Sequence, residues 1–211
     1  MKRFLSIIFT FFIITNLYTQ KKSKKLSIDS LTQKKTKSVG IITSYLDNND
    51  ELYLELSDSI FKKEILVVTR FVQLPSNYSG YINAGSKTSE QVVMFEKKGE
   101  KIYLRQKSFS NIANQIDPIN ISVTKNNLTP ILASFKILNK EKNRYLIDVS
   151  SFFLKDSPGF NIIRKTERDK YKIGRADKNR SSIDSANSYP QNLEIKHTLT
   201  FEASKPPRGN N

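Results

Sequence analysis

The stretch QVVMFEKKGEKIYLRQ, residues 91–106, decides the fold class. Two runs rich in β-branched and aromatic residues, QVVMFE (91–96) and KIYLRQ (101–106), flank the polar stretch KKGE. A glycine in a four-residue connection between two such runs is typical of a β-hairpin. We therefore predict two antiparallel strands here, and the fold is built outward from them.

Similar runs on both sides extend the predicted sheet. Residues 51–56 (ELYLEL) alternate between apolar and polar, and the apolar run 64–69 (EILVVT) suits a strand buried on both faces. Residues 131–138 and 144–150 predict a second hairpin, and 193–201 (LEIKHTLTF) alternates again. The sequence thus predicts a mainly β fold, an antiparallel sandwich or curled sheet, with α+β as the alternative.

Helices are expected to be few and short. The best candidates are residues 151–154 and 181–187, with a helical turn near residues 30–33 as a further candidate. Four prolines fall between the predicted strands, where a missing backbone N–H does not disturb a ladder. They are Pro118, Pro130, Pro158 and Pro190.

The N-terminus has the pattern of an export signal. Lys2 and Arg3 precede the apolar run FLSIIFTFFII (4–14), which is followed by a more polar stretch. Spanning a bilayer takes about 20 apolar residues, so this short run predicts no permanent membrane span. We expect residues 1–20 to be a signal peptide and the protein to be exported, to the periplasm, the outer surface or the extracellular medium. An uncleaved anchor and a buried N-terminal strand are the alternatives.

Charge divides the rest of the chain, whose formal net charge is +15. Residues 21–39 are rich in lysine and predict a solvated tether. Residues 40–203 then form one β-rich domain, and residues 204–211 begin a linker. A second basic patch, residues 164–180, is either a solvated face or a contact for anionic surface polymers. Nucleic-acid binding is not expected, because only Tyr171 among these charges could stack on a base.

The residue inventory excludes most familiar site chemistry. The chain has no cysteine and one histidine, which excludes disulfides, thiolate nucleophiles and metal sites that need two imidazoles. It has no Gly-x-Ser-x-Gly elbow and no glycine-rich phosphate loop. We predict no catalytic, cofactor-binding or metal-binding residues and no cofactor.

A few polar residues have both a functional and a structural interpretation, and the structural one is favoured each time. His197 is expected on a strand face, and Asp148 as a hydrogen-bonded carboxylate. The stretch DNNDE (47–51) resembles the start of a calcium loop, but Leu52 stands where that loop needs glycine, so an Asx-capped turn is expected. Asp177 and Arg180 are expected to pair across a turn.

Several of these segments, taken in order, resemble a known family. They are residues 64–70, 91–96, 103–105, 128–135, 146–149, 177–181, 189–195 and 199–201. Together they are similar to the N-terminal, non-catalytic region of secreted bacterial zinc-dependent metalloproteases of the met-zincin type. That region is described as two adjoining domains of unknown function, and the likeness covers residues 40–201.

The resemblance implies an ancestry, and it carries no activity over to this sequence. The family's catalytic part would lie downstream, with a His-Glu-x-x-His helix that binds zinc. This sequence has no such motif, so no zinc ligand or catalytic glutamate can be assigned to any position in it. Its last residues, PPRGNN (206–211), resemble the linker toward a protease domain, which suggests a truncated reading frame or a fragment; a free-standing relative is the alternative.

Two functional hypotheses follow. In the first, the chain is the accessory region of a metalloprotease. Its partner is the catalytic domain, in the same polypeptide if the reading frame continues, and the chain assists the folding of that domain, masks its cleft or positions its substrate. In the second, it is an independent exported binding module for anionic polymers or the cell surface. An unrecognised enzyme is a third possibility. Under the first hypothesis we expect an uncovered apolar face near residues 193–201.

Overall fold

The computed structural model describes residues 26–76, 78, 82–157, 160 and 163–206. The strands are β1 Thr36–Ser38, β2 Thr43–Leu46, β3 Leu52–Ser57, β4 Ile65–Arg70, β5 Lys87–Lys98, β6 Lys101–Lys107, β7 Ile131–Glu141, β8 Arg144–Asp148, β9 Ile173–Ala176, β10 Ser182–Ser188, β11 Leu193–Thr198 and β12 Phe201–Ala203. The helices are α1 Ile28–Thr32, α2 Ile119–Asn126, α3 Ser150–Phe153 and α4 Lys165–Tyr171, with short 3₁₀ turns η1 Asp58–Ile60 and η2 Lys178–Arg180. The predicted mainly β fold is confirmed.

One antiparallel sheet dominates the fold, in the order β1-β2-β3-β8-β7-β6-β5-β4. The predicted hairpin over residues 91–106 is present as β5 and β6, with Lys98 opposite Lys101 across a turn that contains Gly99. Gly99 has a φ of 59°, a left-handed conformation that glycine adopts without steric cost. The second predicted hairpin is also confirmed, as β7 and β8.

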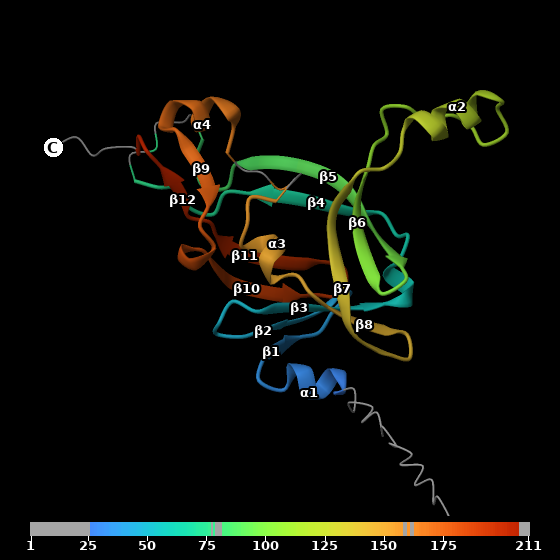
Figure 1. The fold of residues 1–211 in the computed structure, drawn as a ribbon, viewed down its shortest axis with the longest axis horizontal. Coiled ribbons are helices and arrows are strands. Elements are labelled where there is room, and N and C mark those ends of the chain that lie inside the picture. Colours follow the sequence, from blue (N-terminus) through green and yellow to red (C-terminus); the bar gives the residue numbers. More distant parts are fainter. Residues whose placement is uncertain (1–25, 77, 79–81, 158–159, 161–162, 207–211) are drawn as a thin grey trace, which may run out of the picture.

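The sheet curls around a small second sheet formed by β10 and β11. Figure 1 shows this hairpin lying between β4 on one side and β3 on the other. The core lies between the inner face of the large sheet and the hairpin, and its side chains come from both. Its most deeply buried members include Leu52, Leu56, Ile60, Ile102, Ile147 and Val149. In β3 the alternation of the sequence places every second residue in this core.

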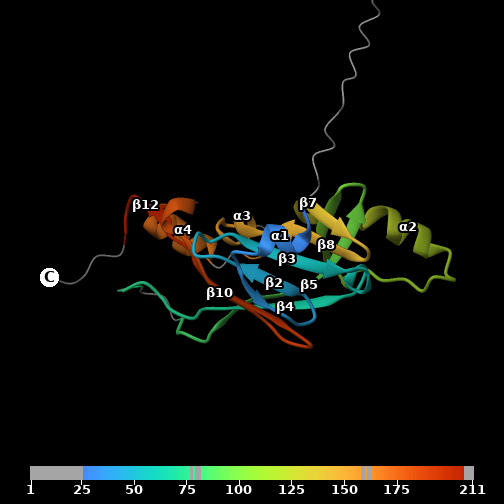
Figure 2. The ribbon, with the colours of Figure 1, turned by 90° about the horizontal axis from the view of Figure 1, so that it is seen from below.

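Smaller elements sit at the two ends of the molecule. Strands β9 and β12 form a separate pair beside α4. Figure 2 shows α4 and β12 at one end of the molecule and α2 at the other. In the part of the chain that the structure describes, no helix is long and apolar enough to cross a membrane. The predicted signal peptide, residues 1–20, lies outside the described residues.

The expectation of a solvated tether over residues 21–39 is wrong for its described part. Helix α1 begins two residues before the expected helical turn, and its Ile28 is fully buried against Tyr45 and Leu146 on the outer face of the sheet. Strand β1 then pairs with β2. The lysine content made this hard to predict, because Lys34 and Lys37 are exposed while Ile28 and the paired ammonium group of Lys35 anchor the segment.

Two further expectations are corrected. Residues 181–187, expected as a helix, form strand β10, because pairing with β11 satisfies their backbone and buries Ile183 and Ala186. Residues 64–69, expected to be buried on both faces, form the edge strand β4, whose Leu66 and Val68 are exposed. Helix α3 confirms the candidate at 151–154, and α2 and α4 were not anticipated.

Candidate functional site

A long apolar groove opens between β4 and the β10–β11 hairpin. It has a volume of about 990 Å³, and both β4 and β11 line it along their length. Its floor reaches core side chains of the curled sheet, among them Leu54, Val93 and Phe135. The sheet is therefore open along this side, and the groove gives access to its core.

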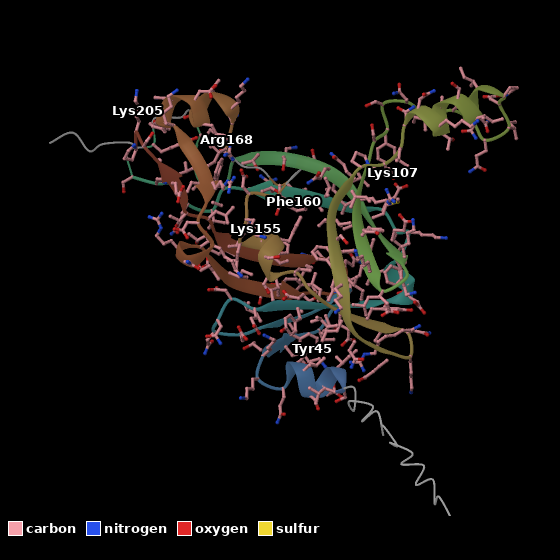
Figure 3. The ribbon with its side chains drawn as sticks, in the orientation of Figure 1. Tyr45, Lys107, Lys155, Phe160, Arg168 and Lys205 are labelled. Atoms are coloured by element: carbon pink, nitrogen blue, oxygen red, sulfur yellow. The ribbon has the colours of Figure 1, made fainter. Side chains whose placement is uncertain are left out.

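Aromatic side chains from α3 and the segment after it line part of the groove. The ring centroids of Phe152 and Phe160 lie 4.8 Å apart in an edge-to-face arrangement, and those of Phe152 and Phe135 lie 5.8 Å apart. Figure 3 shows Phe160 beyond α3, on the side toward β4. Edge-to-face packing fixes these rings, so this part of the lining is a preformed apolar surface.

His197 lies in this lining, on the face of β11 that the sequence predicts. Its Nδ1 donates a 2.7 Å hydrogen bond to the carbonyl oxygen of Phe153, and the two rings lie edge to face. Burial lowers the pKa of His197, since its effect exceeds the opposing effects of the Phe153 carbonyl and Asp184. His197 is thus a neutral packing residue, which confirms the structural interpretation.

Two strand edges border the groove without a partner strand. Strand β4 is the last strand of the large sheet, and β11 pairs only with β10 among the described residues. Backbone groups on the free side of a strand are ready to pair with another extended chain. The apolar run from Ile65 to Val68 carries no charge, proline or bulge that would discourage such pairing.

The end of the groove where β4 and β11 finish is surrounded by basic residues. Tyr171, Ile173 and Phe201 line this end, and they belong to α4, β9 and β12. The same elements carry the basic patch 164–180, which has eight basic and three acidic residues. Of these, Arg168 forms a salt bridge with Asp156, while Lys165, Lys172 and Arg175 are exposed. In Figure 3 Arg168 lies at α4.

A second apolar surface lies far from the groove, on the excursion between β6 and β7 that contains α2. None of the residues of α2 is buried, and Ile116 beside it is 85% exposed. Other exposed apolar side chains of this excursion are Phe109, Ile112, Ile119, Ile121 and Leu128. A run of this kind on one projecting segment is unusual for a surface that faces only water.

The remaining polar candidates are structural, as expected. Asp47 Oδ1 accepts from the backbone N–H groups of Asn49 and Glu51, which confirms the Asx turn. Its other oxygen lies 2.6 Å from Lys35 Nζ, and this ammonium group also binds the Glu51 carboxylate. Burial favours the neutral acid, but these bonds outweigh it, so the pKa of Asp47 is lowered.

Two other expected contacts are present. Asp148 Oδ1 accepts from the backbone N–H of Ser150, and Asp177 Oδ2 accepts from Arg180 Nε at 2.6 Å. Both confirm a structural interpretation. Within the described residues, no group of three or more histidine, cysteine, aspartate or glutamate side chains is placed to hold a metal ion.

Sequence reasoning placed β11 correctly but missed the groove as a whole. Leu193 and Ile195 of the expected apolar face are half-buried and line it. The most exposed apolar side chains of the described residues are instead on the α2 excursion, and Leu66 and Val68 of β4 are also exposed. A signal existed for the excursion, because residues 108–130 carry apolar residues at helical spacing, Ile112, Ile116, Ile119 and Val123, outside the predicted strands. None existed for the free edge of β4, which follows from the strand order alone.

Comparison with protein-family models places this chain in a family. A model described as "Domain of unknown function (DUF5117)" matches residues 85–211, which is more than half of the chain. The chain belongs to the DUF5117 family. A second model, "Domain of unknown function (DUF5118)", matches residues 25–74. No curated protein and no solved structure matches the chain significantly.

The DUF5118 and DUF5117 segments form one structural unit. The DUF5118 segment contributes β1 to β4 and the DUF5117 segment contributes β5 to β8, and all eight strands belong to a single sheet. They meet twice, where β3 pairs with β8 and where β4 pairs with β5. The groove is likewise shared, since β4 comes from one segment and β11 from the other.

Proposed function

We propose that this chain is a non-catalytic accessory region that docks on a polypeptide partner. One observation carries the proposal: the curled sheet is open along an apolar groove, and the two strand edges that border it have no partner strand among the described residues. A surface of this kind is typical of protein–protein contact. The second apolar surface, on the α2 excursion, supports the same conclusion because it also lacks a cover among the described residues.

The partner that we propose is the catalytic domain of a secreted zinc metalloprotease, with the chain itself exported. The support is the sequence resemblance to the N-terminal region of such proteases, together with membership in a family of unknown function. The chain would then act by steric means, by assisting the folding of the catalytic domain, masking its cleft or positioning its substrate. Zinc and the bond chemistry would belong to the partner.

The molecular mass of the native product, and the proteolytic activity that precipitates with it, test this proposal. An antibody raised against residues 40–201 is used on envelope and secreted fractions of the source cells. A band far larger than the 24.3 kDa of this chain, with zinc-dependent proteolytic activity in the immunoprecipitate, is expected. A band at or below 24.3 kDa whose immunoprecipitate has no proteolytic activity would contradict it.

The second candidate is a binding module for anionic surface polymers, and the exposed cations of α4 and β9 favour it. Attraction of this kind weakens steeply with salt, because the Debye length falls from about 10 Å at 0.1 M to about 3 Å at 1 M. Apolar docking in the groove is far less sensitive to salt. Retention on a heparin column at 0.1 M salt that is lost by 1 M, without any protease partner, would favour this candidate.

A further inference from the structure

The groove lies between two strand edges and could hold one extended segment. Strands β4 and β11 border it, and Figure 1 shows both running in the same direction, from the side of η1 toward the side of β12. One extended segment that runs the opposite way between them would be antiparallel to both. It could pair with the free backbone groups of β4 on one side and of β11 on the other, and it would close the curled sheet.

The side chains along the two edges specify what such a segment presents inward. Ile65 and Val67 of β4 and Leu193 and Ile195 of β11 are half-buried and pack against the core. Successive residues of a strand point to opposite faces. Apolar residues at alternate positions of the inserted strand would cover these four side chains and the aromatic rings beyond them.

The basic patch specifies the charge at one end of this antiparallel segment. Because it runs antiparallel to β4, its N-terminal end lies where β4 ends, at Arg70 and beside α4 and β9. The patch 164–180 carries a net charge of +5 there, and its Lys172 and Arg175 are exposed next to the groove-lining Ile173. Acidic residues at the N-terminal end of the strand complement this charge.

We propose that an extended segment of the partner enters this groove as an added β-strand, antiparallel to β4 and β11, with acidic residues at its N-terminal end and apolar residues at alternate positions after them. The inference rests on the proposed function, since it specifies how the partner is held. It predicts that affinity depends on the inner face of β4 and on the charge of the patch.

Synthetic peptides of about ten residues test it on the full chain. The probe has three aspartates followed by alternating valine and threonine, and a matched peptide has three lysines in place of the aspartates. Fluorescence anisotropy at about 0.15 M salt is expected to show at least about tenfold tighter binding of the aspartate peptide. Slowed hydrogen exchange of β4 and β11 amides is expected on binding. Equal affinities, or unchanged exchange at both strands, would overturn the proposal.

Two variants locate the binding. Val67→Lys places a charge on the inner face of β4 and is expected to weaken the aspartate peptide about tenfold or more, while Leu128→Lys, on the exposed α2 excursion, leaves it unchanged. The double variant Lys172→Glu with Arg175→Glu changes exposed residues only. It lowers the net charge of the patch from +5 to +1 and is expected to remove the preference for the aspartate peptide, which keeps the test decisive even where Val67→Lys disturbs folding.

Failure of this inference is distinguishable from failure of the proposed function. A separately produced protease domain of the native product that still binds folded Val67→Lys and the double variant as tightly as the wild type would overturn strand addition and leave the accessory role intact. Peptide binding as expected, together with a native product that has no protease partner, would contradict the metalloprotease assignment and leave the groove as a strand-binding site.

Discussion

The backbone N–H of Leu52 donates a 2.8 Å hydrogen bond to the side-chain oxygen of Ser150, 98 residues further along the chain. Ser150 Oγ donates in turn to Asp148 Oδ1, and Asp148 also accepts from the Ser150 backbone N–H. The contact is buried and joins the first residue of β3 to the first residue of α3. One hydroxyl group therefore adds a buried contact between the DUF5118 and DUF5117 segments, beside the β3–β8 ladder that also joins them.

Replacement of this hydroxyl should be costly. In Ser150→Ala the N–H of Leu52 stays buried without its partner, and a buried donor left in this way costs about 1–3 kcal/mol. Ser151→Ala, one residue further in the same helix and exposed, is the matched control and should change stability by less than about 0.5 kcal/mol. Urea unfolding followed by circular dichroism measures both. Equal midpoints for the two variants would contradict the role of this contact.

The two family segments should not fold separately. A cut between residues 74 and 85 removes the partner of β4, and it also removes β8 from β3, so both pieces lose ladder pairing and expose core side chains. We expect residues 25–74 alone and residues 85–211 alone to show no cooperative thermal transition, and an equimolar mixture to recover β structure. A cooperative thermal transition of either piece alone would show that this segment folds without the other, against the prediction.

The strands that the sequence predicted well are those with local partners. The β5–β6 and β7–β8 hairpins are connected by short turns, so alternation and turn residues within about 20 residues specify them. Strand β10 was mistaken for a helix because its serines and alanine carry little β preference. What makes it a strand is pairing with β11 and its contact with β2, where Ser44 Oγ donates to the carbonyl oxygen of Ala186 at 2.7 Å.

The groove could not be predicted from the sequence for a related reason. The apolar run 64–69 is equally compatible with a central strand and with an edge strand. The residues of a short strand do not show whether it pairs with one neighbouring strand or with two. Likewise, the anchoring of α1 depends on Ile28, which meets Tyr45 and Leu146 only in the folded sheet. Strand order decides the free edge of β4, and long-range contacts decide the anchoring of α1. Neither can be read from a single sequence.

The single histidine predicts a defined pH dependence. Burial lowers the pKa of His197 in the folded protein below its ordinary value near 6.5, so the unfolded chain binds a proton more readily. Stability should therefore decline as the pH falls below about 6.5, by at most about 1.4 kcal/mol per pH unit from this group. His197→Gln should remove that part of the decline. Urea unfolding between pH 7.5 and 5, above the range of most carboxyls, measures it, and identical profiles would contradict the assignment.

Tyr45, on the outer face of the sheet, is expected to ionise at unusually high pH. Arg144 binds the Glu55 carboxylate with two 2.7 Å hydrogen bonds, and the Tyr45 hydroxyl donates a third at 2.8 Å. Burial, followed by this contact with Glu55, raises the pKa of Tyr45 to about 12. Ultraviolet difference titration should show one phenol that ionises later than the others. Tyr45→Phe should remove that late phase, whereas Tyr189→Phe, at an exposed tyrosine, should leave it in place.

Gly40 should be intolerant of any side chain. A Cβ atom there would lie 2.3 Å from the carbonyl oxygen of Tyr189 and 2.5 Å from its backbone nitrogen, far inside contact distance. The neighbouring N–H of Ile41 donates to that same carbonyl, so the two backbones cannot separate without losing a hydrogen bond. We expect Gly40→Ala to destabilise the fold by about 1–3 kcal/mol, even though alanine lowers the entropy of the unfolded chain.

Gly174→Ala provides the comparison for this change. A Cβ atom at Gly174 meets its nearest neighbour, Glu202 Cβ, at 3.5 Å, an ordinary contact distance, so this variant should equal or slightly exceed the wild type in stability. Because Gly40 belongs to the DUF5118 segment and Tyr189 to the DUF5117 segment, the pair of variants also tests their joint fold. Equal urea midpoints for Gly40→Ala and Gly174→Ala would mean that Gly40 and Tyr189 lie further apart than the structure places them.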